Sequence, residues 1–311
     1  MVPTEEQQKI IDYNSNTVVI AQPGSGKTFT LANKITSILD ELPIYRGVIA
    51  ISFTRKASRE LEKRCMDGGI DKKGTFFGTM DKFYISEIIL PFGRHLFSKP
   101  KKELEIIDKD HPVFKKYIEY GGADDLKSWF NKNMKILKWL YSEGYVILES
   151  VSELAMEVLL NSKACKRYLS ARYSHIIIDE YQDSGRDQHN LFIELNNLGL
   201  IGIAVGDINQ SIFGFADKSS EFLIELAQNK SYKLFHITKN HRCHPSIINY
   251  SMKLISREFN DFIQTNESRM YRKKIIGNEI DIARWLDNVI PKTMSMFDVD
   301  DFNKVGILVR G

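Results

Sequence analysis

Cysteine is scarce in this sequence, with three residues among 311. Cys65, Cys165 and Cys243 are odd in number, lie far apart and form no Cys-x-x-Cys pair. Disulfide-rich secreted domains and zinc ribbons both need cysteines paired at short spacing. The sequence therefore predicts reduced thiols, and it argues against a disulfide framework or a cysteine zinc site.

Long apolar runs are also missing, as is an excess of charge of either sign. No stretch approaches the roughly 20 apolar residues of a membrane-spanning helix, and the first residues, MVPTEEQQKI, are too polar for a signal peptide. The 43 basic residues nearly balance the 40 acidic ones, which permits nucleic-acid binding without indicating it. We expect a cytoplasmic protein with no membrane partner and, at 43% hydrophobic residues, a sizeable core.

Strand-like and helix-like segments alternate over most of the chain. Helical spacing follows most of the strand-like segments, as from Lys27 to Leu39. Strands that alternate with helices predict an α/β fold with a parallel sheet. The predicted strands lie at residues 17–21, 47–53, 75–79, 175–179, 200–206 and 232–238.

The alternation breaks between residues 85 and 170, where amphipathic segments predict a helical insertion. We therefore expect an α/β domain formed by residues 1–84 and 171–262, interrupted by this insertion. Residues 263–311 have an ambiguous pattern until NKVGILVRG (303–311), which predicts one more strand. A strand so close to the end has little after it to pack against, so we expect a second domain that is cut short.

The segment AQPGSGKT (21–28) has the layout of a P-loop, except that alanine replaces the usual first glycine. It follows a predicted strand and opens a predicted helix. Backbone N–H groups of such a turn surround phosphate oxygens, and Gly24 and Gly26 let the backbone approach closely. Lys27 would place its charge on the β- and γ-phosphates, while the Thr28 hydroxyl would reach Mg²⁺. A flexible glycine turn is the alternative.

Adjacent carboxylates end the most apolar strand, in HIIIDEYQDS (175–184). Charge at the end of a buried strand is unfavourable unless a cation or a reaction compensates it. With a P-loop present, Asp179 is predicted to hold Mg²⁺ and Glu180 to orient or deprotonate the attacking water. Alone, the pair would indicate a solvated loop, so the prediction depends on both motifs.

The ordered set of motifs resembles the N-terminal half of the UvrD/Rep/PcrA group of superfamily 1 DNA helicases. PTEEQ resembles its Q motif, ISFTRKASREL motif Ia, GTMDKF motif Ib, DEYQDS motif II, VGDINQSIFGF motif III and TKNHRCHPSI motif IV. Within the group, GTMDKFYISEIILPF and DEYQDSGRDQHNLF look most similar to the helicase subunit of Gabija-type anti-phage systems. The resemblance implies a RecA-like P-loop parallel sheet (domain 1A), a 1B-like helical insertion, and the start of an incomplete second RecA-like domain (2A-like).

The resemblance also implies a site for ATP and Mg²⁺ built from several motifs. Gln7 would read the adenine, Gln210 would sense the γ-phosphate, and Arg242 would clamp it. His241 stands where the family stacks a tyrosine on adenine, which puts base selectivity in doubt. The residues implied in nucleotide binding or catalysis are Gln7, Gly24, Ser25, Gly26, Lys27, Thr28, Thr30, Asp179, Glu180, Gln210, His241 and Arg242.

Single-stranded or partly duplex DNA is the implied partner, and aromatic faces suit a motor that grips any sequence. Its path would be lined by Phe53, Thr54, Thr79, Phe213 and Phe215. Taken alone, the last two would more often be core side chains. Phe215 replaces the family's usual tryptophan, Ala216 an arginine and Asp81 a histidine, so the grip on DNA is expected to be weaker or different.

Two functions stay open at this point. Motifs V and VI, with an arginine finger that contributes roughly 10³-fold or more, are expected beyond residue 311. In the first interpretation, the chain is an incomplete DNA-stimulated ATPase motor of a 3′–5′ helicase. In the second, it is a nucleotide- and DNA-responsive module of a defence or repair complex that activates a partner, such as a nuclease subunit, without unwinding DNA itself. The intact catalytic set favours the motor because a pure binder has no need of a base.

Overall fold

Two compact units make up the chain, Met1–Arg242 and Cys243–Gly311. The two units are groups of residues in mutual contact, and they divide after Arg242. The domain boundary predicted between residues 262 and 263 stays a prediction. The computed structural model describes residues 2–67, 69–119, 126–208, 220–271 and 273–307.

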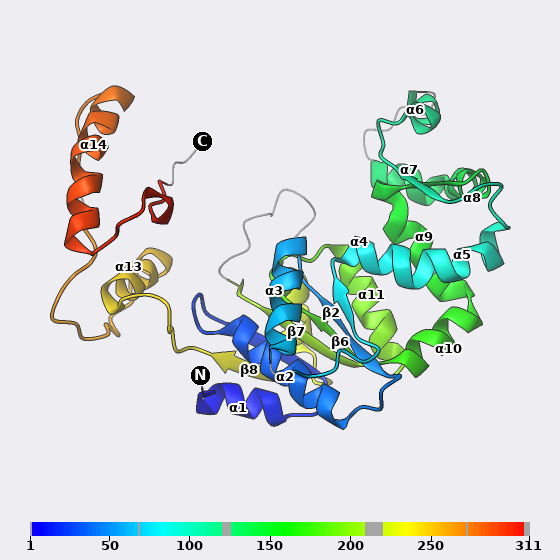
Figure 1. The fold of residues 1–311 in the computed structure, drawn as a ribbon, viewed down its shortest axis with the longest axis horizontal. Coiled ribbons are helices and arrows are strands. Elements are labelled where there is room, and N and C mark those ends of the chain that lie inside the picture. Colours follow the sequence, from blue (N-terminus) through cyan, green and yellow to red (C-terminus); the bar gives the residue numbers. More distant parts are fainter. Residues whose placement is uncertain (1, 68, 120–125, 209–219, 272, 308–311) are drawn as a thin grey trace. The chain divides into compact units, whose positions relative to one another are not determined.

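A parallel sheet of six strands forms the centre of the first unit (Figure 1). The strand order is β3-β2-β6-β7-β1-β8, and every neighbouring pair is parallel. The predicted α/β fold with a parallel sheet is thereby confirmed. The strands are β1 (Thr17–Ala21), β2 (Gly47–Ile51), β3 (Phe76–Gly78), β6 (Tyr173–Ile178), β7 (Ile201–Gly206) and β8 (Lys233–Ile237).

Helices cover both faces of the sheet because each crossover between parallel strands carries one or more of them. Strand side chains alternate between the faces, so Val48 and Ala50 join one buried cluster while Ile49 and Ile51 join the other. The first cluster includes residues of α1 (Glu5–Asp12), α2 (Lys27–Glu41) and α3 (Arg55–Met66). The second includes residues of α11 (Arg186–Asn197) and α12 (Glu221–Gln228).

Between β3 and β6 the chain is mostly helical, and its apolar side chains continue the second cluster. Sequence patterns missed the short strands β4 (Glu105–Ile107) and β5 (Tyr145–Ile147), which pair in parallel. The helical elements are α4 (Met80–Phe83), the π-helix η1 (Tyr84–Ile89), α5 (Leu90–Phe97), α6 (Pro112–Glu119), α7 (Leu126–Lys132), α8 (Met134–Ser142), η2 (Leu148–Ser150), α9 (Val151–Asn161) and α10 (Lys163–Arg172).

The second unit contains α13 (Pro245–Ile255), α14 (Glu279–Met296) and the short 3-10 helix η5 (Phe302–Lys304). The strand predicted at 303–311 is wrong as far as the structure describes it, because η5 occupies its start and residues 305–307 form no strand. A strand needs a neighbour for its N–H and C=O groups, and the described part of this unit offers none. No helix of the described residues is both long and apolar enough to span a membrane.

Candidate active site and nucleic-acid interface

The predicted P-loop joins β1 to α2, and its glycines are needed on two grounds. Gly24 and Gly26 both have left-handed backbone conformations, with φ of 71° and 85°. A Cβ on Gly24 would lie 2.8 Å from Arg242 Cβ and from Asn240 Oδ1, and one on Gly26 would lie 2.8 Å from Gln7 Nε2. Side chains at these positions would therefore be strained and would also clash.

The start of α2 provides a cradle for an anion. Gly26 is the N-cap residue, so no side chain caps the N–H groups at this end of the helix. Ser25 is fully buried, and among the described atoms its Oγ has no hydrogen-bond partner. A buried hydroxyl without a partner is unfavourable, so this site fits a ligand with polar oxygens. Lys27 and Thr28 are half-buried in the first turn, whereas the Thr30 hydroxyl donates to the Gly26 carbonyl at 3.1 Å.

Asp179 directly follows β6 and is 6% exposed. Burial, with a smaller contribution from the neighbouring Glu180 charge, raises the pKa of this carboxyl to about 6. A carboxylate in such surroundings gains by holding a cation, and with Thr28 it offers the oxygen ligands that Mg²⁺ prefers. The described residues contain no group of three or more His, Cys, Asp or Glu side chains suited to a metal. Mg²⁺ sites completed by phosphate and water do not require one.

Glu180 lies at the centre of the polar contacts in this site. Lys27 Nζ is 2.7 Å from its Oε2, and Gln182 Nε2 donates to the same oxygen at 2.8 Å. The Glu180 backbone is left-handed, with φ of 53°, which costs on the order of 1 kcal/mol for a residue with a side chain. The structure therefore holds the predicted base against the predicted phosphate-binding lysine.

Gln182 was missed by sequence reasoning. It lies in the short 3-10 helix η3 (Tyr181–Asp183), is 2% exposed, and accepts a hydrogen bond from the Asp207 N–H at 2.9 Å. Its amide thus connects Glu180 to the end of β7. Its place two residues after Glu180 in DEYQD was the available signal. The predicted site residues Gln210, Phe213 and Phe215, and the variant position Ala216, lie outside the described residues.

Gln7 lies beneath the P-loop in α1, 3% exposed. Its Nε2 donates to the Ser25 carbonyl at 3.0 Å, and its Oε1 accepts from the Thr4 N–H at 2.9 Å, so it also caps the helix. The buried Lys34 ammonium holds the other end of α1 by donating to the carbonyls of Ile11 and Tyr13. The structure thus ties Gln7 to the nucleotide site, and adenine recognition stays a prediction.

His241 and Arg242 follow β8 and lie beside the P-loop, far from it in sequence. The His241 N–H donates to the Gly24 carbonyl at 2.8 Å, and both side chains are exposed. The structure therefore brings the Q motif, the P-loop, motif II and this segment to the carboxyl edge of one sheet. Ligands of open α/β sheets bind at this edge.

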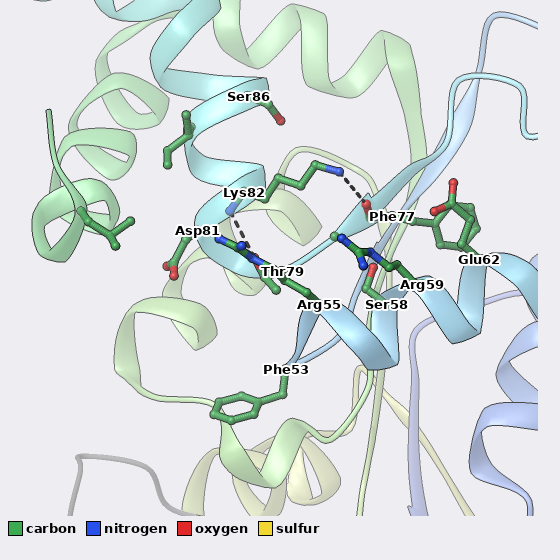
Figure 2. A pocket seen from close by; sticks show the side chains of 13 residues that line it. Phe53, Arg55, Ser58, Arg59, Glu62, Phe77, Thr79, Asp81, Lys82 and Ser86 are labelled. Carbon is green, nitrogen blue, oxygen red and sulfur yellow. Dashed lines mark hydrogen bonds between the residues drawn. The ribbon is translucent and has the colours of Figure 1, made fainter. Parts of the chain in front are cut away.

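A pocket of about 700 Å³ opens at the carboxyl ends of β2 and β3 (Figure 2). Phe53 is 42% exposed there, and Thr79 lines the wall. Figure 2 shows Arg55 and Arg59 reaching from α3 towards α4, where Lys82 lies. The lining residues are Phe53, Arg55, Ser58, Arg59, Glu62, Phe77, Gly78, Thr79, Asp81, Lys82, Ile85, Ser86 and Leu148.

Both predicted DNA-contacting threonines are helix caps. Thr54 Oγ1 accepts from the Ala57 N–H at 3.1 Å, and Thr79 caps α4 in the same way. Sequence reasoning missed Arg59, because RKASRELEKR (55–64) resembles an ordinary solvated helix face. It also missed Lys82, which lies in GTMDKF (78–83). The spacing of four between Arg55 and Arg59 was the available signal.

All the residues described above for the nucleotide site and for the pocket belong to the first compact unit. These sites lie within Met1–Arg242.

A family model and several curated relatives match this chain. A family model described as an AAA domain matches residues 5–216, more than half of the chain. The Gabija protein GajB of Bacillus cereus (strain VD045) is 32% identical over 282 residues, which cover 89% of this chain and 52% of GajB. ATP-dependent DNA helicase Rep of Buchnera aphidicola subsp. Schizaphis graminum (strain Sg) is 23% identical over 349 residues, which cover 96% of this chain and 51% of that protein.

Among solved structures, the Pif1 helicase from Candida albicans aligns with a TM-score of 0.41 and 16% identity, over 84% of this chain and 46% of that chain. The chain spans about half the length of the two curated relatives described above. The family match, together with the ordered motifs and these relatives, shows that the chain belongs to the AAA-domain family of P-loop proteins, among its UvrD/Rep-like superfamily 1 helicase members.

Proposed function

We propose that the chain is the ATP-hydrolysing motor core of a UvrD-like DNA helicase, stimulated by single-stranded DNA and moving 3′ to 5′. The observation that carries this proposal is the paired geometry of Lys27 and Glu180, 2.7 Å apart across the P-loop and motif II. A pure binding site needs the lysine, and Asp179 for a metal ion, but has no need of a second carboxylate, Glu180, beside them. The polarity rests on the family resemblance alone.

Binding of a triphosphate changes the partners of Lys27. In the structure its ammonium faces Glu180, and the γ-phosphate offers a more highly charged partner in the same place. When Lys27 moves to the phosphate, Glu180 keeps its bond from Gln182 and turns an oxygen towards solvent. Glu180 is then placed to orient or deprotonate water. Mg²⁺, held by Asp179 and Thr28, would supply neutralisation of the phosphate charge.

The pocket of Figure 2 suits a single strand of DNA. The exposed Phe53 ring offers a stacking face that every base can use, and Arg55, Arg59 and Lys82 offer cations to the phosphates. Asp81 also lines the pocket and opposes DNA binding locally, as the sequence indicated.

Hydrogen bonds between strand ends connect the two sites. The Asp179 N–H donates to the Ile51 carbonyl at 3.0 Å. The N–H of Ser52, which follows Ile51 in the chain, donates to the Gly78 carbonyl at 3.1 Å. Asp179 belongs to the nucleotide site, whereas Gly78 lines the pocket. These backbone hydrogen bonds, which join the two sites through three neighbouring strand ends, support the proposed stimulation of ATP hydrolysis by DNA.

A second candidate is a nucleotide- and DNA-responsive module that activates a partner, such as a nuclease subunit, in a defence complex. The observation that favours it is the similarity to the Gabija protein GajB. In this case the chain would bind ATP without hydrolysing it alone. The two candidates differ in whether Glu180 acts as a base.

The test is Glu180→Gln, which keeps the size and the contact with Lys27 but removes the base. We expect nucleotide affinity within about threefold of the parent and hydrolysis slower by about 100-fold or more. Calorimetric titration with a non-hydrolysable ATP analogue and a phosphate-release assay provide the two readouts. Hydrolysis at the parent rate would show that Glu180 is not the base.

A further inference from the structure

Asn240 joins the segment after β8 to the P-loop through both ends of its amide. Its Nδ2 donates to the Pro23 carbonyl at 2.6 Å, and its Oδ1 accepts from the Arg242 N–H at 2.8 Å. Between them, the His241 N–H donates to the Gly24 carbonyl at 2.8 Å. A donor and an acceptor on one short side chain are both required, and among short side chains only asparagine has both in this geometry.

The segment Asn240–Arg242 packs closely against Gly24 of the P-loop. A Cβ built on Gly24 would lie 2.8 Å from Asn240 Oδ1 and 2.8 Å from Arg242 Cβ. The backbone of Arg242 is therefore placed by the phosphate-binding loop itself. Among the described residues, the Arg242 guanidinium has no hydrogen-bond or ion-pair partner. The position of the Arg242 backbone therefore sets the region that the guanidinium can reach.

We infer that Asn240 is a positioning residue, which seats Arg242 for the γ-phosphate by fixing its backbone to the P-loop. The inference rests on the proposed function, in which Arg242 binds that phosphate. Movement of the P-loop on binding ATP is then transmitted to Arg242, the last residue before the second compact unit. Asn240 itself touches no phosphate.

A purely structural role makes a different prediction. If Asn240 only shaped the P-loop, its loss would weaken ATP and ADP binding equally, because both fill the loop with phosphates. If it acts through Arg242, its loss weakens only the nucleotide that carries a γ-phosphate. The ratio of the two dissociation constants therefore separates these roles.

The experiment is calorimetric titration of the full chain, in Mg²⁺, with ADP and with a non-hydrolysable ATP analogue. We expect Arg242→Ala to weaken binding of the ATP analogue about tenfold, since one charge-assisted contact is lost. Asn240→Ala should weaken it about fivefold, with ADP binding within twofold of the parent. The double variant should be no weaker than Arg242→Ala alone.

Two further variants sharpen the test. Asn240→Ser keeps an oxygen for the turn but is too short to reach Pro23, so it should behave like Asn240→Ala. Asn229→Ala is the matched control, because Asn229 Oδ1 accepts from the Ser231 N–H at 2.9 Å in the same kind of turn at the other end of β8. It should bind both nucleotides as the parent does.

Equal losses for ATP analogue and ADP, additive losses in the double variant, or no loss would each overturn the inference. If Arg242→Ala itself leaves binding of the ATP analogue unchanged, the proposed γ-phosphate site fails and the inference fails with it. If Arg242→Ala behaves as expected while both Asn240 variants bind like the parent, the inference alone fails.

Discussion

The proposed nucleotide site and the proposed nucleic-acid pocket lie at the same edge of one sheet, but different contacts hold each of them together. In the nucleotide site, polar groups bind one another: Glu180 contacts both Lys27 and Gln182, and Asn240 bonds the P-loop. In the pocket, cations are distributed over α3 and α4, and the aromatic face of Phe53 is 42% exposed.

The difference is expected from the ligand proposed for each site. A triphosphate has one shape, and buried polar groups that recognise it must each have a defined partner. A strand of any sequence offers repeated phosphates and π-faces, so several similar cations can share the contacts. Substitutions should therefore be severe in the nucleotide site and graded in the pocket.

The largest effect is expected for Lys27→Ala. It removes the charge that would bind the β- and γ-phosphates and leaves Glu180 without its cation. We expect nucleotide affinity at least about 100-fold weaker. Calorimetric titration measures this, with the exposed Lys9→Ala on α1 as the control. Retained affinity would contradict the P-loop assignment.

A smaller loss is expected for Gln182→Ala, which removes one contact of the proposed base, Glu180, and the acceptor for the Asp207 N–H. We expect hydrolysis slower by about 30-fold, with nucleotide affinity near that of the parent. Gln188→Ala is the control, because Gln188 caps a neighbouring helix and lies outside the site. If nucleotide affinity fell as much as turnover, Gln182 would have a structural role in place of a catalytic one.

In the pocket, Phe53→Ala should weaken binding of single-stranded DNA about tenfold, through loss of one stacking face. Fluorescence anisotropy with a labelled oligonucleotide measures the dissociation constant. Tyr45, which is 70% exposed and does not line the pocket, provides the control variant Tyr45→Ala. Equal effects of the two variants would remove Phe53 from the DNA path.

The smallest effect is expected for Arg59→Ala, because neighbouring cations remain. DNA affinity should fall about threefold, and the slope of log affinity against log salt should become less steep by about 0.7, as for one lost phosphate contact. Arg64→Ala on the same helix is the matched control, since Arg64 pairs with Glu60 at 2.8 Å and lies outside this pocket. An unchanged salt slope would contradict the phosphate contact.

The parts of the fold with local signals could be predicted from the sequence. The strand predicted at 17–21 has those bounds in the structure, and the predicted helix from Lys27 begins there. The strand is a mostly apolar run between polar residues, and the helix begins after a glycine and has apolar residues at helical spacing. The pair β4 and β5 could not be predicted, because each strand has three residues and is fixed by a distant partner.

The residues of the candidate site could likewise be predicted only where a local sequence motif marks them. Lys27, Asp179 and Glu180 stand in motifs whose spacing carries their chemistry. The roles of Gln182 and Asn240 depend on hydrogen bonds to residues such as Asp207 and Pro23, which are distant in sequence. Tertiary structure alone decides such partners. Of the strand predicted at 303–311, the described residues 303–307 form none for a related reason, since an apolar segment forms a strand only beside another.

The most direct test of the account is steady-state ATP hydrolysis by this chain, with and without single-stranded DNA, beside Lys27→Ala. The account predicts hydrolysis that rises with DNA concentration and is absent in the variant. Nucleotide binding without hydrolysis at any DNA concentration would contradict it, and would assign the chain to the binding-module function.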